Sequence, residues 1–209
     1  MSNLIKMRIN DFLDELASDS PAPGGGTVAA LSGAVGASLV SMVCNLTRGK
    51  EKYKDVQEEI KKVLRKSEQL RKQLMELVDM DTMAFNEVMK ALKMPRENDA
   101  EKEKRKQALQ NAFEKAASVP LDTARKCIEV LDTALVVAEK GNQNSITDSA
   151  VSALMADAGV RSAILNVKIN LSSIKDQSFV EKTLQEIQEL EKTADEKTRS
   201  VLKIVNRKI

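Results

Sequence analysis

EKYKDVQEEIKKVLRKSEQLRKQLMELVDMDTMAFNEVMKALKM, residues 51–94, carries the strongest structural signal in this chain. It contains neither glycine nor proline, and its apolar residues recur at spacings of three and four. The recurring positions are Tyr53, Val56, Ile60, Val63, Leu70, Leu74, Leu77, Ala84, Val88 and Leu92. This spacing predicts one very long amphipathic helix. Because such a stripe exceeds what a small bundle would bury alone, it also predicts a homo-oligomer.

The remaining sequence also favours helix. Its 209 residues suit one domain, residues 1–209, and 2% aromatic residues are too few for most sheets. Further helices are expected over residues 10–18, 27–47, 98–119, 120–141, a segment following the polar turn 141–148, and 177–206. Pro120 is expected to open a new helix. The sequence therefore predicts an all-α helical bundle of about six or seven helices, one of them very long.

The segment from Ser20 to Thr47 has no charged residue, and residues 27–47 are long enough to span a membrane. This stretch, however, contains several serines and glycines, few large side chains and no flanking aromatic belt. We therefore expect a central helix that is buried on all sides, where small residues let neighbouring helices approach closely.

Charge and residue usage restrict the function. With 33 basic and 31 acidic residues, the net charge of +2 gives no electrostatic case for nucleic acid or a membrane as the main partner. Cys44 and Cys127 lie among apolar residues with no signal peptide before them, which favours reduced thiols in a cytoplasmic protein over a disulfide. The chain has no histidine, so catalytic triads, Cys-His pairs and histidine-based metal sites are excluded.

Asp81 breaks the apolar pattern of the long helix. Continuing the stripe from Leu70, Leu74 and Leu77 places this carboxylate where hydrophobic residues otherwise point. A buried carboxylate is costly unless it is paired, and its pKa tends to rise, which suits proton transfer. A structural ion pair or a local hydrogen bond is the alternative. Asp79 faces away from the stripe, which indicates a solvated charge.

Three other features are candidate binding elements. Arg105 lies on the inward stripe of its helix, where it would pair with an anion, or else extend along the surface. The triplet Gly24, Gly25 and Gly26 would expose backbone N–H groups to an anion or a carbonyl, or else form a tight turn. Amide and acidic side chains gather further along the chain, although turn and capping roles would explain the first three: Asn142, Asn144, Asp148, Asn166 and Asn170.

Four segments together resemble the cyclodeaminase family, which comprises the deaminase half of formiminotransferase-cyclodeaminase and its stand-alone relatives, including methenyltetrahydrofolate cyclohydrolases. These segments are SPAPGGGTVAALSGAVGASLVSMV (20–43), LVDMDTMAF (77–85), ALKMPRENDAEKEKRKQALQNAFEKAASVPL (91–121) and GNQNSITDSAVSALMADAGVRSAILNVKINL (141–171). They are distributed along the chain from residue 20 to residue 171, in the order found in the family. One departure is Thr27, where relatives often carry serine, and it keeps the hydroxyl group.

The resemblance implies an all-helical homodimer that acts on a tetrahydrofolate derivative, polyglutamylated forms among them, with no metal and no cofactor beyond that substrate. It implies a catalytic aspartate, which we assign to Asp81, with Asp79 as second choice. It also implies that a set of further residues lines the folate pocket: Gly24, Gly25, Gly26, Arg105, Asn142, Asp148, Asn166 and Asn170.

Two reactions follow from this resemblance. One converts 5-formiminotetrahydrofolate to 5,10-methenyltetrahydrofolate and ammonia, and the other hydrolyses the methenyl compound to 10-formyltetrahydrofolate. The transferase half of the bifunctional enzymes is absent, so the first reaction would draw its substrate from a separate formiminotransferase. One carboxylate of raised pKa serves either reaction. A non-catalytic helical scaffold is the alternative of another class.

Overall fold

The computed structural model describes residues 3–209, which form six α-helices and three short 3₁₀ helices with no strand among them. The α-helices are α1 (Ile9–Leu16), α2 (Gly25–Thr47), α3 (Gln57–Leu92), α4 (Asp99–Lys140), α5 (Ile146–Leu171) and α6 (Gln177–Asn206). The 3₁₀ helices are η1 (Leu4–Lys6), η2 (Glu51–Val56) and η3 (Gln143–Ser145). The predicted all-α fold is confirmed.

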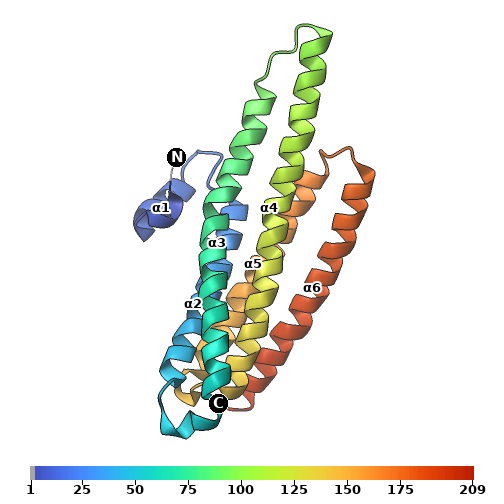
Figure 1. Ribbon diagram of the computed structural model, residues 1–209. Helices are drawn as coiled ribbons and strands as arrows, with labels where there is room; N and C mark the ends of the chain where they lie inside the picture. Colours follow the sequence, from blue (N-terminus) through green and yellow to red (C-terminus); the bar gives the residue numbers. More distant parts are fainter. Residues whose placement is uncertain (1–2) are drawn as a thin grey trace.

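Four helices form a closed bundle. Helix α2 packs against α3 and α5, and α4 packs against the same two helices from the other side. Helix α6 covers α4 and α5, while α1 stands apart on the left in Figure 1. The paired ends of α3 and α4 extend beyond the other helices at the top of that view. Much of α3 and α4 is therefore enclosed, whereas their connected tips are open to solvent on several sides.

The long apolar stripe of residues 51–94 lies inside this bundle. Ile60, Leu70 and Leu74 are fully buried, and Val78 is 1% exposed. Helices α2 and α4 thus cover most of the stripe within one chain, although Leu92 at its end is 43% exposed. The buried part of the stripe gives no reason for an oligomer, so that reason was wrong. The first turns also differ from expectation, because Glu51–Val56 is 3₁₀ and Tyr53 has non-helical torsion angles. The hydroxyl of Tyr53 accepts a hydrogen bond from the Gln143 backbone N–H at 2.9 Å, which ties this corner to the α4–α5 turn.

Pro120 does not begin a helix. Helix α4 continues through it from Asp99 to Lys140, with Asn98 as the N-cap, so the count is six helices and not seven over the described residues 3–209. A proline inside a helix removes one backbone hydrogen bond and crowds the carbonyl four residues earlier. Here that carbonyl belongs to Ala116, and it accepts a hydrogen bond from the side-chain amide of Asn170 on α5 at 2.9 Å. Packing on four neighbouring helices and this replacement bond keep α4 continuous.

The uncharged helix α2 is a core helix. Helix α2 and the segment Gln143–Leu171 are each long and apolar enough to cross a membrane, a test that core helices of soluble proteins also pass. Helix α2 contacts α3, α4 and α5, as the small residues predicted. It is not buried on all sides, however, because Val28, Val35 and Met42 are exposed. Close approach is most evident at Cys127, because a Cβ atom on Gly33 or Gly159 would lie 2.5 or 2.7 Å from its Sγ.

Both cysteines are free and buried. Burial raises the pKa of the Cys44 thiol and that of the Cys127 thiol to about 12. Neither side chain is therefore a thiolate at neutral pH, which agrees with the predicted role of two reduced core thiols.

Candidate functional site

A cavity of about 330 Å³ lies where the N-terminus of α2 meets α3, α4 and α5. Its walls are mostly apolar and include two phenylalanine rings, and a few polar groups converge on it. The lining residues are Pro21, Ala22, Gly24, Gly25, Gly26, Asp81, Phe85, Val88, Phe113, Ala116, Asn166, Ile169 and Asn170. An apolar cavity with a few placed polar groups is typical of a small-molecule site.

Asp81 is the carboxylate of this cavity. It projects from α3, and its Oδ2 atom accepts a hydrogen bond from the Thr27 hydroxyl at 2.9 Å. The Thr27 hydroxyl lies 3.4 Å from that of Thr82, which extends the network into the core. No basic side chain of residues 3–209 forms an ion pair with Asp81. Of the structural alternatives, the local hydrogen bond is present and the ion pair is not.

The surroundings of Asp81 raise its pKa above the ordinary value of an aspartate. Burial is the largest cause, because it disfavours the charged form, and hydrogen bonds from the Thr27 side chain and backbone act in the opposite direction. The proximity of the N-terminus of α2 also favours an anion at this position. Burial therefore makes this carboxyl more basic than that of an exposed aspartate, which suits proton transfer.

The glycine triplet forms the wall opposite Asp81. Gly24 is the N-cap of α2, while Gly25 and Gly26 occupy its first turn, so α2 begins two residues earlier than expected. Backbone N–H groups in a first turn have no partner within the helix. A Cβ atom on Gly26 would lie 2.1 Å from Asp81 Oδ1, and one on Gly25 would lie 3.3 Å from Asn166 Nδ2. The triplet thus lets the backbone approach two of the polar side chains of the site.

Asn166 and Asn170 lie one turn apart on α5 and both line the cavity. The Asn166 amide donates to the carbonyl of Ser162 at 2.8 Å. The Asn170 amide donates to the carbonyls of Ala116 and Asn166, at 2.9 and 2.8 Å. Both side chains are half-buried and held by backbone groups, so their remaining polar atoms have restricted directions.

Four predicted site residues lie outside this cavity. Asp79 accepts a hydrogen bond from the Leu4 backbone N–H at 2.7 Å, so it anchors the N-terminal segment and is not fully solvated. Asn142 is buried in the α4–α5 turn, where its side chain donates to the Leu46 carbonyl. Asp148 lies in the first turn of α5, about 27 Å from Asn166 at 1.5 Å of helix rise per residue. From the sequence, we grouped Asn142 and Asp148 with Asn166 and Asn170 because all four are polar residues in one segment. The length of α5 places the first two at the opposite end of the helix from the cavity.

The fourth residue, Arg105, belongs to a neighbouring pocket of about 380 Å³ near the tip of α3 and α4. Its guanidinium donates to the Leu92 carbonyl at the end of α3. Among the described residues no carboxylate lines this pocket, whose walls are Arg96, Lys102, Arg105, Lys106, Leu109, Gln110, Phe113 and Lys175. Because Phe113 also lines the Asp81 cavity, this basic pocket adjoins it.

Sequence reasoning missed several apolar walls of the cavity. Phe85 follows Asp81 by four residues, one helical turn, so its spacing could have identified it. Phe113 and Ile169 come from other helices, and nothing in their local sequence distinguishes them from core residues. Thr27 was noted for its hydroxyl, but its partner Asp81 is 54 residues away and no local pattern joins the two.

Comparisons with known proteins agree with this architecture. The sequence model of the formiminotransferase-cyclodeaminase family matches residues 8–189. The crystal structure of formiminotetrahydrofolate cyclodeaminase from Thermotoga maritima superposes with a TM-score of 0.87 at 34% identity, covering 96% of each chain.

Two curated relatives extend the comparison. Methenyltetrahydrofolate cyclohydrolase from Methylorubrum extorquens is 50% identical over 182 residues, which are 87% of this chain and 88% of that protein. Mouse formimidoyltransferase-cyclodeaminase is 34% identical over 188 residues. Those residues are 90% of this chain but 35% of the mouse protein, so the similarity concerns one part of the bifunctional enzyme.

Proposed function

Because the chain belongs to the formiminotransferase-cyclodeaminase family and is a one-carbon folate enzyme, we propose that it acts on the carbon that bridges N5 and N10 of tetrahydrofolate. The first candidate reaction closes 5-formiminotetrahydrofolate to 5,10-methenyltetrahydrofolate with release of ammonia. The observation that carries this proposal is Asp81, a carboxyl of raised pKa in a cavity that offers aromatic walls and helix N-terminal donors.

In the proposed deaminase reaction, N10 attacks the formimino carbon and forms the second carbon–nitrogen bond. The formimino group reacts in its protonated amidinium form, so its nitrogen already carries two hydrogens. Asp81 accepts the proton that N10 loses and returns it to that nitrogen, which leaves as ammonia while the positive charge remains on the methenyl group. The apolar walls exclude water from the reacting carbon, and Phe85 and Phe113 offer ring faces to the pterin and benzoyl groups. Acid–base transfer by one carboxyl requires no metal ion or nicotinamide, and we propose that none takes part.

The cyclohydrolase reaction is the second candidate. The relative with 50% identity over most of both chains bears that name, which favours this activity. Here Asp81 would remove a proton from the water that attacks the methenyl carbon. The bond from that carbon to N5 then breaks, and N5 takes the proton from Asp81. The remaining hydroxyl proton is released to solvent as the formyl carbonyl forms, and 10-formyltetrahydrofolate is the product. The same carboxyl and the same cavity serve both reactions.

One absorbance experiment separates these candidates. The methenyl compound is followed in the presence of a chelator, first with 5-formiminotetrahydrofolate as substrate and then with methenyltetrahydrofolate. Rapid formation from the formimino compound identifies the deaminase, and enzyme-dependent loss without such formation identifies the cyclohydrolase. If the protein is inactive in both assays, the proposed reaction is refuted and the non-catalytic scaffold is the remaining interpretation.

The basic pocket is our proposed site for the glutamate tail of the folate. It adjoins the Asp81 cavity at Phe113 and presents five cationic side chains. Lys102 and Lys106 form exposed ion pairs with Asp99 and Glu103 one turn away, and such pairs exchange readily for carboxylates of a ligand. A tail of several glutamates would meet this positive charge outside the reacting centre.

Charge reversal tests this assignment. The double variant Lys102→Glu and Lys106→Glu is expected to raise KM for a polyglutamylated substrate by about 3- to 10-fold, as expected for two exposed charge contacts. KM for the monoglutamate form should change far less, and added salt should reduce the difference. Lys104→Glu is the matched control, since Lys104 lies on the same helix outside the pocket. Equal effects on both substrates would contradict the tail site.

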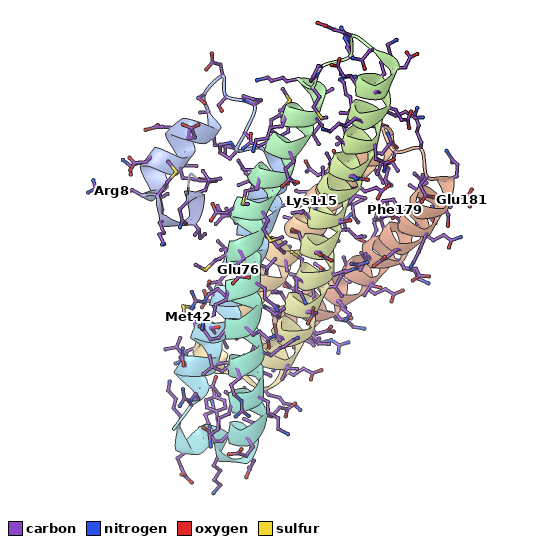
Figure 2. All side chains as sticks on the ribbon, turned by 45° about the horizontal axis from the view of Figure 1, so that its top comes forward. Arg8, Met42, Glu76, Lys115, Phe179 and Glu181 are labelled. Atoms are coloured by element: carbon purple, nitrogen blue, oxygen red, sulfur yellow. The ribbon has the colours of Figure 1, made fainter. Side chains whose placement is uncertain are left out.

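We propose that the enzyme is a cytoplasmic homodimer that receives its formimino substrate from a separate transferase. Because most of the α3 stripe is buried, we place the interface on a different surface. Helix α2 carries exposed apolar residues spaced by seven, Val28, Val35 and Met42, which are 37%, 40% and 37% exposed. Figure 2 shows Met42 at the outer edge of the bundle. A repeat of seven is typical of a seam between two helices.

Sedimentation equilibrium tests the dimer. We expect a dimer for the unmodified protein at micromolar concentration and a monomer for the double variant Val35→Glu and Met42→Glu, because two charges would be buried at the seam. Leu184→Glu on α6 is the control, because Leu184 is similarly exposed at 38%. A monomeric unmodified protein, or a dimer that survives the double variant, would refute this interface.

A further inference from the structure

Pro120 lies in the middle of α4 and is buried. Proline is the least favourable residue in a helix interior, because it has no N–H to donate and its ring presses on the carbonyl four residues earlier. That carbonyl is Ala116, which lines the Asp81 cavity. Pro120 therefore leaves one backbone oxygen, in a residue that lines the cavity, without its helical hydrogen bond.

Asn170 uses this oxygen. Its Nδ2 donates to the Ala116 carbonyl at 2.9 Å and to the Asn166 carbonyl at 2.8 Å. An amide nitrogen has two hydrogens, so both are engaged. The two carbonyls also determine which end of the amide is the nitrogen, since an amide oxygen there would face two acceptors.

The remaining atom of this amide is Oδ1. Asn170 lines the cavity, and no group of residues 3–209 donates a hydrogen bond to its Oδ1. With both N–H groups engaged, Asn170 offers the cavity an acceptor alone. A folate carries complementary N–H groups on its pterin ring, and the formimino group adds another.

We propose that Pro120 is a positioning residue for the substrate: by leaving the Ala116 carbonyl without its helical partner, it holds Asn170 so that Oδ1 accepts a hydrogen bond from a substrate N–H. This inference rests on the proposed function, since the substrate is the folate of that reaction. It assigns a role in the site to a residue whose side chain does not line the cavity. It also gives a function to the least favourable residue of a helix interior at this position.

Restoring the missing N–H tests the proposal. In Pro120→Ala the N–H of residue 120 bonds the Ala116 carbonyl, which turns back toward the helix axis and away from Asn170. We expect kcat/KM to fall by about 10-fold, the value of one hydrogen bond, chiefly through KM. The melting temperature should rise, because alanine replaces proline inside a helix. Pro120→Gly restores the same N–H with a weaker helix former, so it should lose the same activity at a lower melting temperature than Pro120→Ala.

A double-mutant cycle shows whether Pro120 acts through Asn170. If it does, Pro120→Ala has no further effect on kcat/KM in an Asn170→Ala background. Wild-type kcat/KM in Pro120→Ala, or an equal loss in both backgrounds, would overturn the proposal.

A spectroscopic readout is independent of turnover. The side-chain NH₂ resonances of Asn170 in the free protein should shift in Pro120→Ala and in Pro120→Gly, as the bond to Ala116 is lost. Unchanged resonances would overturn the inference even in an active enzyme. A different outcome is a resonance shift in the variants together with an unmodified protein that is inactive on both folates. It would refute the proposed reaction and the substrate contact, whereas the structural link from Pro120 to Asn170 would stand.

Discussion

Asp81→Asn is expected to lower turnover by about 10²–10⁴-fold, the usual loss when an acid–base group is removed. Asparagine keeps the size of the side chain and an oxygen that accepts the Thr27 hydrogen bond, but it takes up no proton at neutral pH. Substrate binding should persist, so the loss should appear in kcat more than in KM. Steady-state kinetics at saturating substrate measures it.

The fold should not suffer from this change. Burial raises the pKa of Asp81 in the folded chain above its value in the unfolded chain. Stability linked to this carboxyl is therefore fully present at low pH and is lost as pH rises through the folded pKa. The variant carries no such charge, so at pH 7 its melting temperature should equal or exceed that of the unmodified enzyme. The difference should vanish in acid.

Asp79→Asn is the control for the choice of aspartate. The amide oxygen of the introduced side chain would still accept the Leu4 N–H, and Asp79 is not part of the cavity wall. We expect kcat within a few-fold of the unmodified enzyme. A greater loss for Asp79→Asn than for Asp81→Asn would show that the catalytic role belongs to Asp79. A fall in the melting temperature of Asp81→Asn without a fall in its turnover would make Asp81 a structural residue.

Gly26→Ala should reduce kcat/KM by about 10²-fold or more, because displacing a reacting group by roughly 1 Å costs that much. The added Cβ would lie 2.1 Å from Asp81 Oδ1 and 2.6 Å from its Cγ, far inside contact distance. The short carboxylate side chain can yield, whereas the first turn of α2 cannot. The protein should therefore fold while its carboxyl is displaced from the reacting carbon. Circular dichroism and kinetics on the same sample separate the two effects.

Gly24→Ala is the matched control for that experiment. Gly24 lines the same cavity two residues earlier, yet an added Cβ there would meet no atom within 4 Å. Its φ of −140° is available to any residue. Activity within about threefold of the unmodified enzyme is expected for this variant, because the added methyl group meets no protein atom and leaves Asp81 in place. If Gly26→Ala were equally harmless, the close approach of α2 to Asp81 would have no part in the site.

The fold could be predicted because helical spacing is a local signal. The stripe through Leu70 and Leu74 identified α3, and the interruption of that stripe identified Asp81 as the carboxyl that faces the cavity. The comparisons confirm the family resemblance. The catalytic role of Asp81 stays a prediction until the variants are measured.

The features that could not be predicted depend on partners distant in sequence. Pro120 stays within a helix because Asn170, 50 residues later, replaces its lost hydrogen bond, and propensity alone favours a break. Asn142 and Asp148 share a segment with Asn166, but the length of α5 carries them to the other end of the bundle. Polar residues of one sequence segment therefore lie in two places, Asn142 in a turn and Asn166 in the cavity.

The sulfur of Cys127 restricts how related sequences can diverge. Gly33 on α2 and Gly159 on α5 both face this one atom of α4, at distances where neither tolerates a methyl group. A larger residue at any of the three positions displaces a helix unless a smaller residue replaces one of the other two. Because two of the three are already glycine, only Cys127 can become smaller. Substitutions at these three positions should therefore be tolerated chiefly in combination. In related sequences we expect the three residues to vary together, whereas residues on the exposed faces of the same helices vary independently.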